Sequence, residues 1–325
     1  MEGDKGLSAG DGGRVLVLGG SGFVGRRLLQ ELARRNVRLA LLARSPEKLR
    51  PLVPEGAEAA IVEGDLLSGD GLERALEGAH TAFYLVHSMG GRSMAVNREF
   101  AERDKAAARN FVRAADSAGL GRIIYLGGLG ETGPGLSEHL RSRAEVAGIL
   151  SSGRARATVL RAAVIIGAGG ASFEMLRFLV ERLPVMVCPR WIDTRIQPIA
   201  LGDVVKYLVG CLENPETAGR TFDIGGPEIL TYREMMQEYA EARGLARRLI
   251  ITVPVLTPLL AAYWVDLVTP VPSGVAHPLI EGLRNEVVCK ESSIDELVPM
   301  EKTPFREAVK IALSEERAGP GAGGA

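Results

Sequence analysis

A glycine-rich stretch near the start of the chain, Gly19-Gly-Ser-Gly-Phe-Val-Gly25, constrains the fold more than any other feature. It follows an apolar run at 14–18 that is typical of a buried strand, and it precedes a segment at 23–35 with apolar residues at helical spacing. Glycines three residues apart in such a strand–turn–helix unit permit a tight turn, a close backbone approach to a pyrophosphate and close helix packing. The stretch therefore predicts a dinucleotide-binding unit.

The loop and the first helical turn are the expected binding elements. The free N–H groups at the start of a helix and the helix dipole both favour phosphate. The alternative is an ordinary glycine turn between a strand and a helix. The residues that we expect to contact the cofactor here are Gly19, Ser21, Gly22, Phe23, Val24 and Gly25.

Apolar strand-like runs alternate with helical patterns through the first half of the chain. This alternation requires crossover connections between parallel strands. We therefore predict an α/β fold, namely a Rossmann-type, doubly wound and mostly parallel sheet with a small C-terminal substrate lobe. The strands that follow the first one are expected at 37–43, 59–62, 81–86, 122–126, 157–166 and 221–224.

The same patterns divide the chain into parts. The Gly-rich ends, 1–12 and 316–325, are expected to be disordered tails. Residues 13–230 are assigned to the NAD(P)-binding domain, with a lobe insertion at about 170–195. Residues 231–315 are assigned to the substrate lobe and a closing helix.

Bulk composition excludes several function classes. The 325 residues are 46% hydrophobic with a formal net charge of -1, so a large core is expected and no nucleic-acid partner. The three cysteines, Cys188, Cys211 and Cys289, have neither metal-ligand spacing nor an even disulfide framework. The N-terminus has no apolar signal core. We expect a cytoplasmic protein without a metal site.

Arg44 follows the second predicted strand, 19 residues beyond Gly25. A unit selective for NAD would have Asp or Glu near this position to bind the ribose 2′-hydroxyl. A guanidinium instead forms a charge-assisted pair with a 2′-phosphate. The alternative is a solvated loop arginine. The residue favours NADP (NADPH) as cofactor over NAD.

Two further strand ends carry candidate cofactor contacts. Asp65, followed by Leu66, can accept from the adenine amino group, or it can serve as an ordinary turn aspartate. Val86 and His87 follow the fourth strand, where a loop can line the nicotinamide half of a site. His87 can instead cap or brace that loop.

A predicted helix after the fifth strand carries His139 and Arg143. The two residues are four apart, so both side chains lie on one helix face. Arg143 can donate to a nicotinamide ribose, and His139 can exchange protons near neutral pH. The alternative is a polar helix face that orients the cofactor and performs no chemistry.

Several motifs together resemble the extended and atypical short-chain dehydrogenase/reductase superfamily. The resemblance covers about residues 14–231. The motifs are Gly19-x-x-Gly22-x-x-Gly25, Gly64-Asp65-Leu66, Leu160-Arg161, Pro198-Ile199 with Asp203-Val204, and Phe222-Asp-Ile-Gly-Gly-Pro227. A narrower similarity is to YbjT-type, NmrA-like bacterial NAD(P)-binding proteins, through Phe83-Tyr-Leu-Val-His-Ser-Met-Gly90, His139-Leu-Arg-x-Arg143, and Gly167-Ala-Gly with Phe173-Glu174.

The chain departs from the superfamily pattern at the residues that usually react. The resemblance implies Ser or Thr after the fifth strand and a Tyr-x-x-x-Lys pair on the next helix. Here the strand ends in Gly127-Gly128, and the helix has His139 and Arg143. The candidate catalytic residues are therefore His139 and Arg143.

These observations lead to three hypotheses about function. The first is an NADP-dependent oxidoreductase that transfers hydride to a small apolar carbonyl or enone-type substrate. The second is a non-catalytic NADP-binding sensor or assembly protein, which the loss of the usual hydroxyls favours. The third is a nucleotide-sugar epimerase or dehydratase, which would need the missing Tyr and Lys.

One apolar segment suggests a further partner. Leu249 to Val265 is uncharged, and Tyr263-Trp264 is an aromatic pair suited to a membrane interface. Prolines interrupt it, so it cannot span a bilayer as one helix. Residues 249–272 are expected either to contact a membrane surface or lipid-like substrate, or to pack as lobe core.

Overall fold

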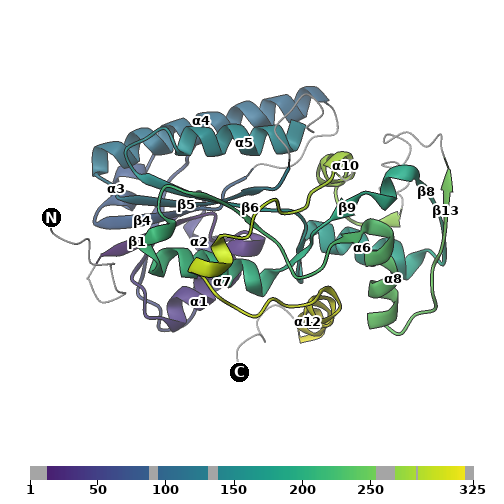
Figure 1. Ribbon diagram of the computed structural model, residues 1–325. Coiled ribbons are helices and arrows are strands. Elements are labelled where there is room, and N and C mark those ends of the chain that lie inside the picture. The colour runs from purple at the N-terminus through teal and green to yellow at the C-terminus, as the bar shows by residue number, and fades with distance from the viewer. Residues whose placement is uncertain (1–12, 88–93, 131–137, 254–267, 283–284, 319–325) are drawn as a thin grey trace.

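The computed structural model describes residues 13–87, 94–130, 138–253, 268–282 and 285–318. Its centre is a seven-stranded sheet in the order β11–β6–β5–β4–β1–β2–β3, and every neighbouring pair is parallel (Figure 1). The predicted α/β, doubly wound fold is confirmed. The strands are β1 (Arg14–Leu18), β2 (Leu39–Ala43), β3 (Ala59–Glu63), β4 (Ala79–Tyr84), β5 (Arg122–Gly128), β6 (Arg156–Ala162) and β11 (Thr221–Ile224).

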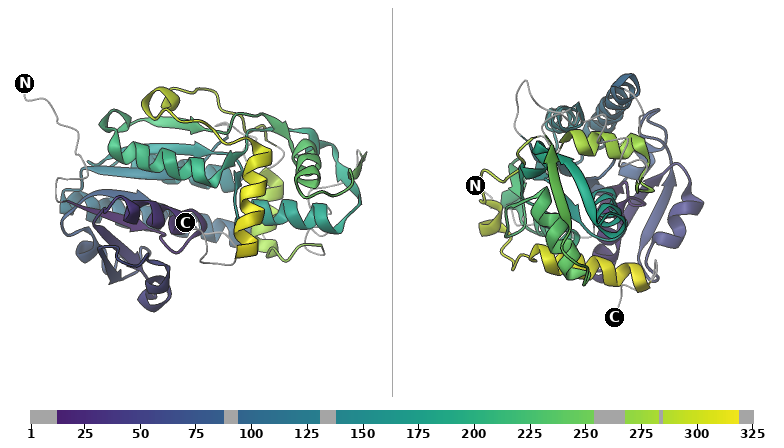
Figure 2. Two further views of the ribbon diagram at one scale, coloured as in Figure 1. Left: turned by 90° about the horizontal axis from the view of Figure 1, so that it is seen from below. Right: turned by 90° about the vertical axis from the view of Figure 1, so that its right-hand side faces the viewer.

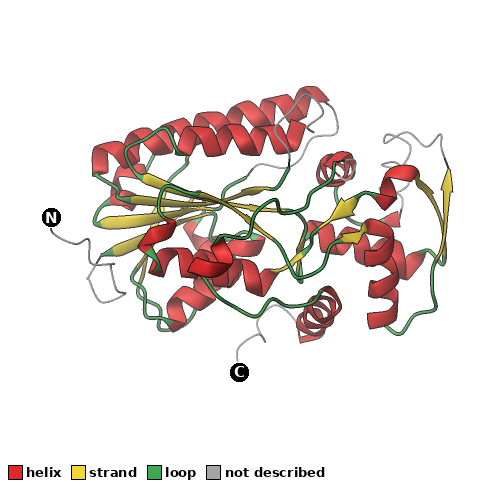
Figure 3. Ribbon diagram, viewed as in Figure 1, coloured by secondary structure: helices red, strands yellow, loops and turns green. Residues whose placement is uncertain are grey.

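Helices cover both faces of this sheet (Figure 3). Three lie on one face, namely α3 (Leu72–Leu76), α4 (Met94–Ala118) and α5 (Glu138–Leu150), and two lie on the other, namely α1 (Phe23–Arg34) and α7 (Leu201–Glu213). A short helix, α2 (Pro46–Leu49), follows β2 and contacts β2 and β3.

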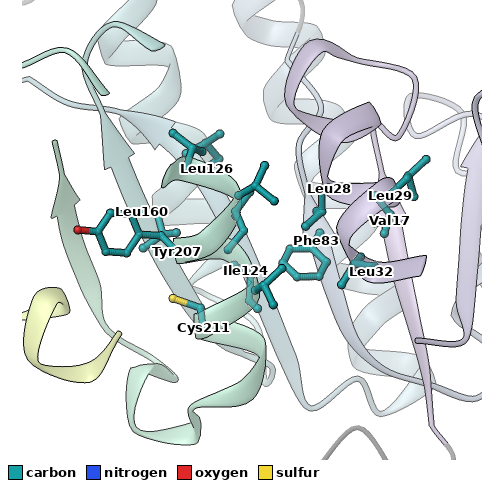
Figure 4. Packing of buried hydrophobic residues seen from close by; sticks show 14 of the residues in the cluster. Val17, Leu28, Leu29, Leu32, Phe83, Ile124, Leu126, Leu160, Tyr207 and Cys211 are labelled. Atoms are coloured by element: carbon teal, nitrogen blue, oxygen red, sulfur yellow. The ribbon is translucent and has the colours of Figure 1, made fainter. Parts of the chain in front are cut away.

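Alternation along each strand explains why both faces are covered. In β1, Val15 and Val17 point to the face under α1 and α7, whereas Leu16 and Leu18 point to the face under α3, α4 and α5. All four are buried, so both faces contribute to the core. Figure 4 shows Val17 packed near Leu28 of α1 and Phe83 of β4. Each such aliphatic side chain contributes about 1.5–3 kcal/mol through burial.

The strand order reverses between β1 and β4. The chain passes from β1 to β2 and β3 on one side, and from β4 to β5, β6 and β11 on the other. At such a reversal the connections that leave the carboxyl ends of the two strands diverge, and ligands bind between them. The turn after β1 is the glycine-rich stretch, so the topology brings this stretch to the binding edge.

The sixth strand is shorter than the run predicted at 157–166. β6 ends at Ala162, and a separate strand β7 (Ile165–Ile166) pairs with β10 (Ile199–Ala200) instead of continuing in the central sheet. The last contact with β5 is the hydrogen bond from Leu129 N to Ala162 O, at 2.8 Å. Apart from Thr158 and Arg161 the run at 157–166 is apolar, and it contains no signal for this departure.

A second lobe has its own hydrophobic core. Its helices are α6 (Ala171–Arg182), α8 (Tyr232–Ala242), α10 (Ser273–Gly282) and α12 (Phe305–Ala318), and its short strand pairs are β8 (Val185–Pro189) with β13 (Leu249–Val253) and β9 (Arg195–Ile196) with β12 (Leu230–Thr231). The lobe core includes Phe173, Met235 and Tyr239. A capping box starts α8, because Thr231 and Glu234 exchange hydrogen bonds between side chain and backbone.

One segment assigned to the lobe lies instead against the dinucleotide-binding domain. Two buried aspartates of that domain hold it there. Asp223 of β11 accepts from the Lys290 backbone at 3.0 Å, and Asp203 of α7 accepts from the Thr303 backbone at 2.6 Å. Between them Ile294, at the start of α11 (Ile294–Leu297), packs into the core under α1 and α7. The sequence of 285–303 does not show whether this segment packs on the lobe or on the dinucleotide-binding domain.

The last described helix joins the two parts of the molecule. Seen from below in Figure 2, α12 crosses the boundary between the sheet and the lobe. Glu315 pairs with Arg27 of α1, and Glu316 pairs with Arg177 of α6. Residues 316–318, expected at the start of a disordered tail, form the end of this helix because these ion pairs hold it. Within the described ranges, no helix has the length and apolar character needed to cross a membrane.

Candidate functional site: the carboxyl edge of the sheet

The glycine-rich loop is held by close backbone contacts. Gly19 has φ +85°, and a Cβ there would lie 2.8 Å from the Leu85 carbonyl oxygen. A Cβ on Gly25 would lie 2.1 Å from the Gly19 carbonyl oxygen. Both contacts exclude a larger residue. The loop after β1 therefore lies directly against the segment after β4 and beneath the start of α1.

Gly22 faces open space, in contrast to its neighbours. A Cβ on Gly22 would meet only the Gly19 carbonyl oxygen within 4 Å, at 3.1 Å. Gly22 is the N-cap of α1 in extended conformation, without a side-chain cap and without an acidic residue in the first turn. The N–H groups of Phe23, Val24 and Gly25 are thus at an uncapped helix start, which suits an anion. Ser21, in the turn, is exposed beside them. This loop fits a pyrophosphate.

Arg44 lies where the sequence analysis expected it, immediately after β2, the strand beside β1. Its side chain is exposed, and within the described residues it forms no ion pair or hydrogen bond. Lys48 of α2 is also exposed. The position suits recognition of a 2′-phosphate, and no carboxylate competes for the guanidinium among the described residues.

Asp65 and Leu66 both make contacts that stabilise the fold after β3. Asp65 Oδ1 accepts from Leu67 N at 2.7 Å, which closes a local turn after β3. Leu66 is buried in the core under α3 and α4, and its carbonyl accepts from Asn110 of α4. Of the two alternatives for Asp65, these contacts favour the turn residue. A contact with adenine stays a prediction.

His87 forms a buried pair with Asp104 of α4. Its Nδ1 lies 3.0 Å from Asp104 Oδ2, and both side chains are largely buried. Burial lowers the pKa of His87 to about 4, and the Arg143 charge acts in the same direction, against the opposing effect of Asp104. His87 is therefore neutral at pH 7 and donates from Nδ1 to the carboxylate. Val86, half-buried beside it, packs on the core. This geometry favours the bracing role for His87.

The sequence analysis did not identify Asp104, although its spacing contains a signal. The buried face of α4 includes Ala108, Phe111 and Ala115, which lie four, seven and eleven residues after Asp104. A carboxylate on that apolar stripe must have a buried partner. Helical periodicity alone could therefore have identified it as a polar residue of the interior.

Arg143 is the cation of this buried group. Burial lowers the pKa of its guanidinium, while Tyr125 and Asp104 act in the opposite direction. Its Nε is buried and has no hydrogen-bond partner among the described residues. With Asp104 ionised and His87 neutral, the group has one positive and one negative charge. The guanidinium thus retains capacity to donate to a ligand oxygen.

Gly128, one of the two glycines at the end of β5, makes room for Arg143. A Cβ on Gly128 would lie 2.9 Å from Arg143 Cδ and 3.0 Å from Leu140 Cδ2. A serine or threonine there would force the arginine side chain to move. The glycine at the end of β5 and the arginine on α5, two departures from the pattern of the superfamily that the motifs resemble, are therefore physically coupled.

A pocket opens between these residues and the lobe, with about 900 Å³ of open space that is continuous with solvent. Arg143 is the one charged side chain among the described residues that line it. Sequence reasoning had not assigned most of the apolar lining, because it comes from distant segments. Lining residues besides Arg143 are Phe23, Gly127, Gly128, Leu129, Leu140, Ala162, Ala163, Val164, Ile165, Gly170, Ala171, Ser172, Leu279, Gly282 and Val287.

Other predicted residues fall outside this description. His139 lies in the first turn of α5, but its side chain is not among the described ones, and Tyr263 and Trp264 lie outside the described residues. Within the described part of the chain, no group of three or more His, Cys, Asp or Glu side chains is arranged to hold a metal ion.

Residues 19–165 match a protein family described as NAD(P)H-binding. The chain contains an NAD(P)-binding domain. This confirms the dinucleotide-binding unit predicted from the glycine spacing. Solved structures of the same fold include a nucleoside-diphosphate-sugar epimerase from Staphylococcus aureus, with a TM-score of 0.71 at 17% identity, covering 91% of this chain and 99% of that one. The narrower similarity to NmrA-like proteins stays a prediction.

Individual relatives are similar to most of the chain at low identity. A mitochondrial NADH dehydrogenase [ubiquinone] 1 alpha subcomplex subunit 9 from Arabidopsis thaliana is 24% identical over 73% of this chain, which spans 59% of that subunit. A ceramide reductase from Caulobacter vibrioides is 27% identical over 73% of each chain. The Citrobacter triphenylmethane reductase complexed with NADP(H) has a TM-score of 0.71 at 18% identity, covering 92% of this chain and 99% of that one.

Gly22 and Gly25 should respond differently to valine. Gly22→Val is expected to abolish dinucleotide binding in a folded protein, because the side chain would occupy the open space expected to hold the pyrophosphate. Gly25→Val is expected to lower stability, because its Cβ would overlap the Gly19 carbonyl oxygen. Cofactor titration and thermal unfolding measure the two effects. Unchanged cofactor affinity in Gly22→Val would show that the loop is only a turn.

His87 should make stability depend on pH. Its folded pKa lies below the unfolded value of about 6.5, so its stabilising contribution is present above pH 6.5 and is lost as the pH falls toward 4. Between pH 7.5 and 5 the loss is expected to be about 2 kcal/mol. Urea unfolding at both pH values should show a smaller loss in His87→Gln than in the parent. Equal losses in parent and His87→Gln would contradict the prediction.

Proposed function

We propose that this protein is an NADP-dependent oxidoreductase that transfers hydride to a small apolar carbonyl or enone-type substrate. The observation that carries the proposal is the pocket beside the glycine-rich loop, in which Arg143 is the one charged side chain among the described lining residues and most of the others are apolar. The similarity to two reductases agrees with this reaction class.

The loop and its surroundings fit the cofactor. The uncapped start of α1 suits the pyrophosphate, and Arg44 suits a 2′-phosphate. When bound, the nicotinamide supplies the hydride. Phe23 lies both in the first turn of α1 and in the pocket lining, so the loop and the pocket are contiguous.

Arg143 has the chemistry to polarise a carbonyl. Its guanidinium lines the pocket and can donate to the oxygen on which negative charge develops. Arg143 remains protonated throughout, so the proton must come from another group. We assign this exchange to His139, as its position four residues earlier on α5 suggests.

The apolar lining selects the substrate class. Leucine, valine, isoleucine and alanine side chains from β6, β7, α10 and the following loop form most of the wall. Such a surface offers few hydrogen bonds to a sugar or nucleotide. A compact apolar molecule with one carbonyl fits this distribution, with its oxygen toward Arg143.

A second candidate function is cofactor binding without turnover. It is favoured by the glycines at 127 and 128, which remove the usual hydroxyl, and by the similarity to a mitochondrial NADH dehydrogenase subunit. The two functions differ in one measurement. Steady oxidation of NADPH with an enal, quinone or ketone supports the enzyme, whereas binding without turnover across such a panel supports the second function.

Arg143→Met tests the assigned role. We expect a loss of about 10²–10³ in kcat with a smaller change in cofactor affinity, as for removal of one oxyanion donor. Arg141→Met, an exposed arginine on the same helix, is the matched control. A normal rate in Arg143→Met would remove this residue from the mechanism, and His139→Phe tests the proton exchange in the same assay.

Cofactor preference is tested at Arg44. Arg44→Asp is expected to weaken NADPH binding by about 1.5–3 kcal/mol, the size of a lost charge-assisted contact, and to affect NADH much less. Arg34→Asp makes the same charge change at the far end of α1 and is the control. Fluorescence titration with both cofactors measures the difference. Equal affinity of the parent for NADPH and NADH would exclude the proposed preference.

A further inference from the structure

The parallel pair β8 and β13 at the far end of the lobe has two unlike faces (Figure 1). On one face Met186, Cys188 and Ile250 pack into or against the lobe core. On the other, Val185, Val187, Leu249 and Ile251 are exposed by 51%, 55%, 57% and 46%. The alternation of the two strands thus separates four aliphatic side chains from the core and directs them outward.

These four side chains form a compact patch. The register places Leu249 opposite Val185, and Ile251 opposite Val187. Directly opposed residues of neighbouring strands lie close together, so the exposed side chains make two adjacent cross-strand pairs. Among the large apolar side chains exposed in the described residues, four of seven belong to this patch. The patch therefore differs from singly scattered surface residues, which need no explanation.

Arginines surround the patch at the strand ends. Arg182 and Arg190 flank β8, and Arg247 and Arg248 precede β13. Arg182 donates to the Val268 carbonyl and Arg248 to the Val180 carbonyl, contacts that leave the positive charges uncompensated. Arg190 and Arg247 are exposed and form no ion pair with any described residue.

Two acidic side chains near the patch, Asp193 and Glu181, are already paired within the described part of the chain. Asp193 binds Arg233 through both of its carboxylate oxygens, at 2.6 and 3.2 Å. Glu181 accepts from Tyr239 and Arg243. The surroundings of the patch consequently have a positive balance, and an apolar surface with a basic rim is complementary to an apolar partner with an anionic surface.

We propose that the exposed face of β8 and β13 docks on the interface of an anionic lipid bilayer. The four aliphatic side chains insert below the headgroups, and the arginines at the strand ends bind lipid phosphates. Each basic side chain near an anionic surface adds to the attraction. The proposal rests on the described strands and is independent of the reaction proposed above.

A second copy of the chain fits this surface less well. A two-fold contact through the same patch would bring the arginine rims of both copies together, and like charges at an interface are unfavourable. Four aliphatic side chains also provide much less area than the approximately 800 Å² per partner of a stable interface. A small apolar patch with basic flanks is sufficient for reversible binding at a lipid surface.

Cosedimentation of the full chain with vesicles tests the proposal. We expect the chain to bind phosphatidylcholine vesicles that contain about 30–40% phosphatidylglycerol, and we expect this binding to weaken at high salt. Little binding to vesicles of phosphatidylcholine alone is expected. The double variant Val187→Asp with Ile251→Asp should bind at least about tenfold more weakly, because it places two charges in the apolar patch. Both positions are exposed, so thermal unfolding should show an intact fold.

The controls distinguish binding through this surface from nonspecific adsorption to vesicles. Ile311→Asp changes an exposed aliphatic residue of α12, 42% exposed, and should leave vesicle binding unchanged. Arg190→Gln with Arg247→Gln should weaken binding to anionic vesicles and reduce its salt dependence. No binding by the parent, or equal loss in Ile311→Asp, would overturn the proposal. The proposal would also be overturned if the parent self-associated without binding vesicles and the double variant lost this self-association, as measured by sedimentation velocity.

Discussion

The close backbone approach between the turn after β1 and the start of α1 is the constraint on which the site depends. At Gly25 there is no room for even a Cβ beside the Gly19 carbonyl oxygen, and Gly19 itself lies against the Leu85 carbonyl. These contacts hold the uncapped end of α1 at the point where the strand order reverses. Gly22 lies between the two tight contacts and faces open space. The glycine-rich stretch is therefore closely packed at Gly19 and Gly25 and accessible to a ligand at Gly22.

Charge balance around Arg143 is the second organising feature. A guanidinium removed from water is costly unless a carboxylate lies near it, and Asp104 of α4 provides that charge. His87, held neutral by burial, is hydrogen-bonded to the same carboxylate and connects the segment after β4 to α4. Gly128 completes the arrangement by providing the space that the larger arginine needs. The consequence is a pocket with one donor-rich cation in apolar surroundings, which supports reduction of an apolar carbonyl more than sugar chemistry.

The lobe provides both the apolar wall of the pocket and the surface proposed to meet lipid. Its core is separate from the two cores that flank the sheet, and α12 connects it to α1 through Glu315 and to α6 through Glu316. Alternation in β8 and β13 decides which residues enter that core and which remain outside. One short strand pair thus packs the lobe on one side and presents aliphatic side chains on the other.

Local patterns were sufficient for the parallel sheet and the glycine turn, because each depends on residues close together in the chain. The same reasoning could have identified Asp104 as a buried residue, since helical spacing places it on the buried face of α4. The end of β6 at Ala162, the packing of 285–303 against Asp203 and Asp223, and the fit of Gly128 to Arg143 depend on the tertiary structure. In each case an apolar or polar group had several possible partners of similar chemistry, and only three-dimensional packing decided which of them lay within contact distance.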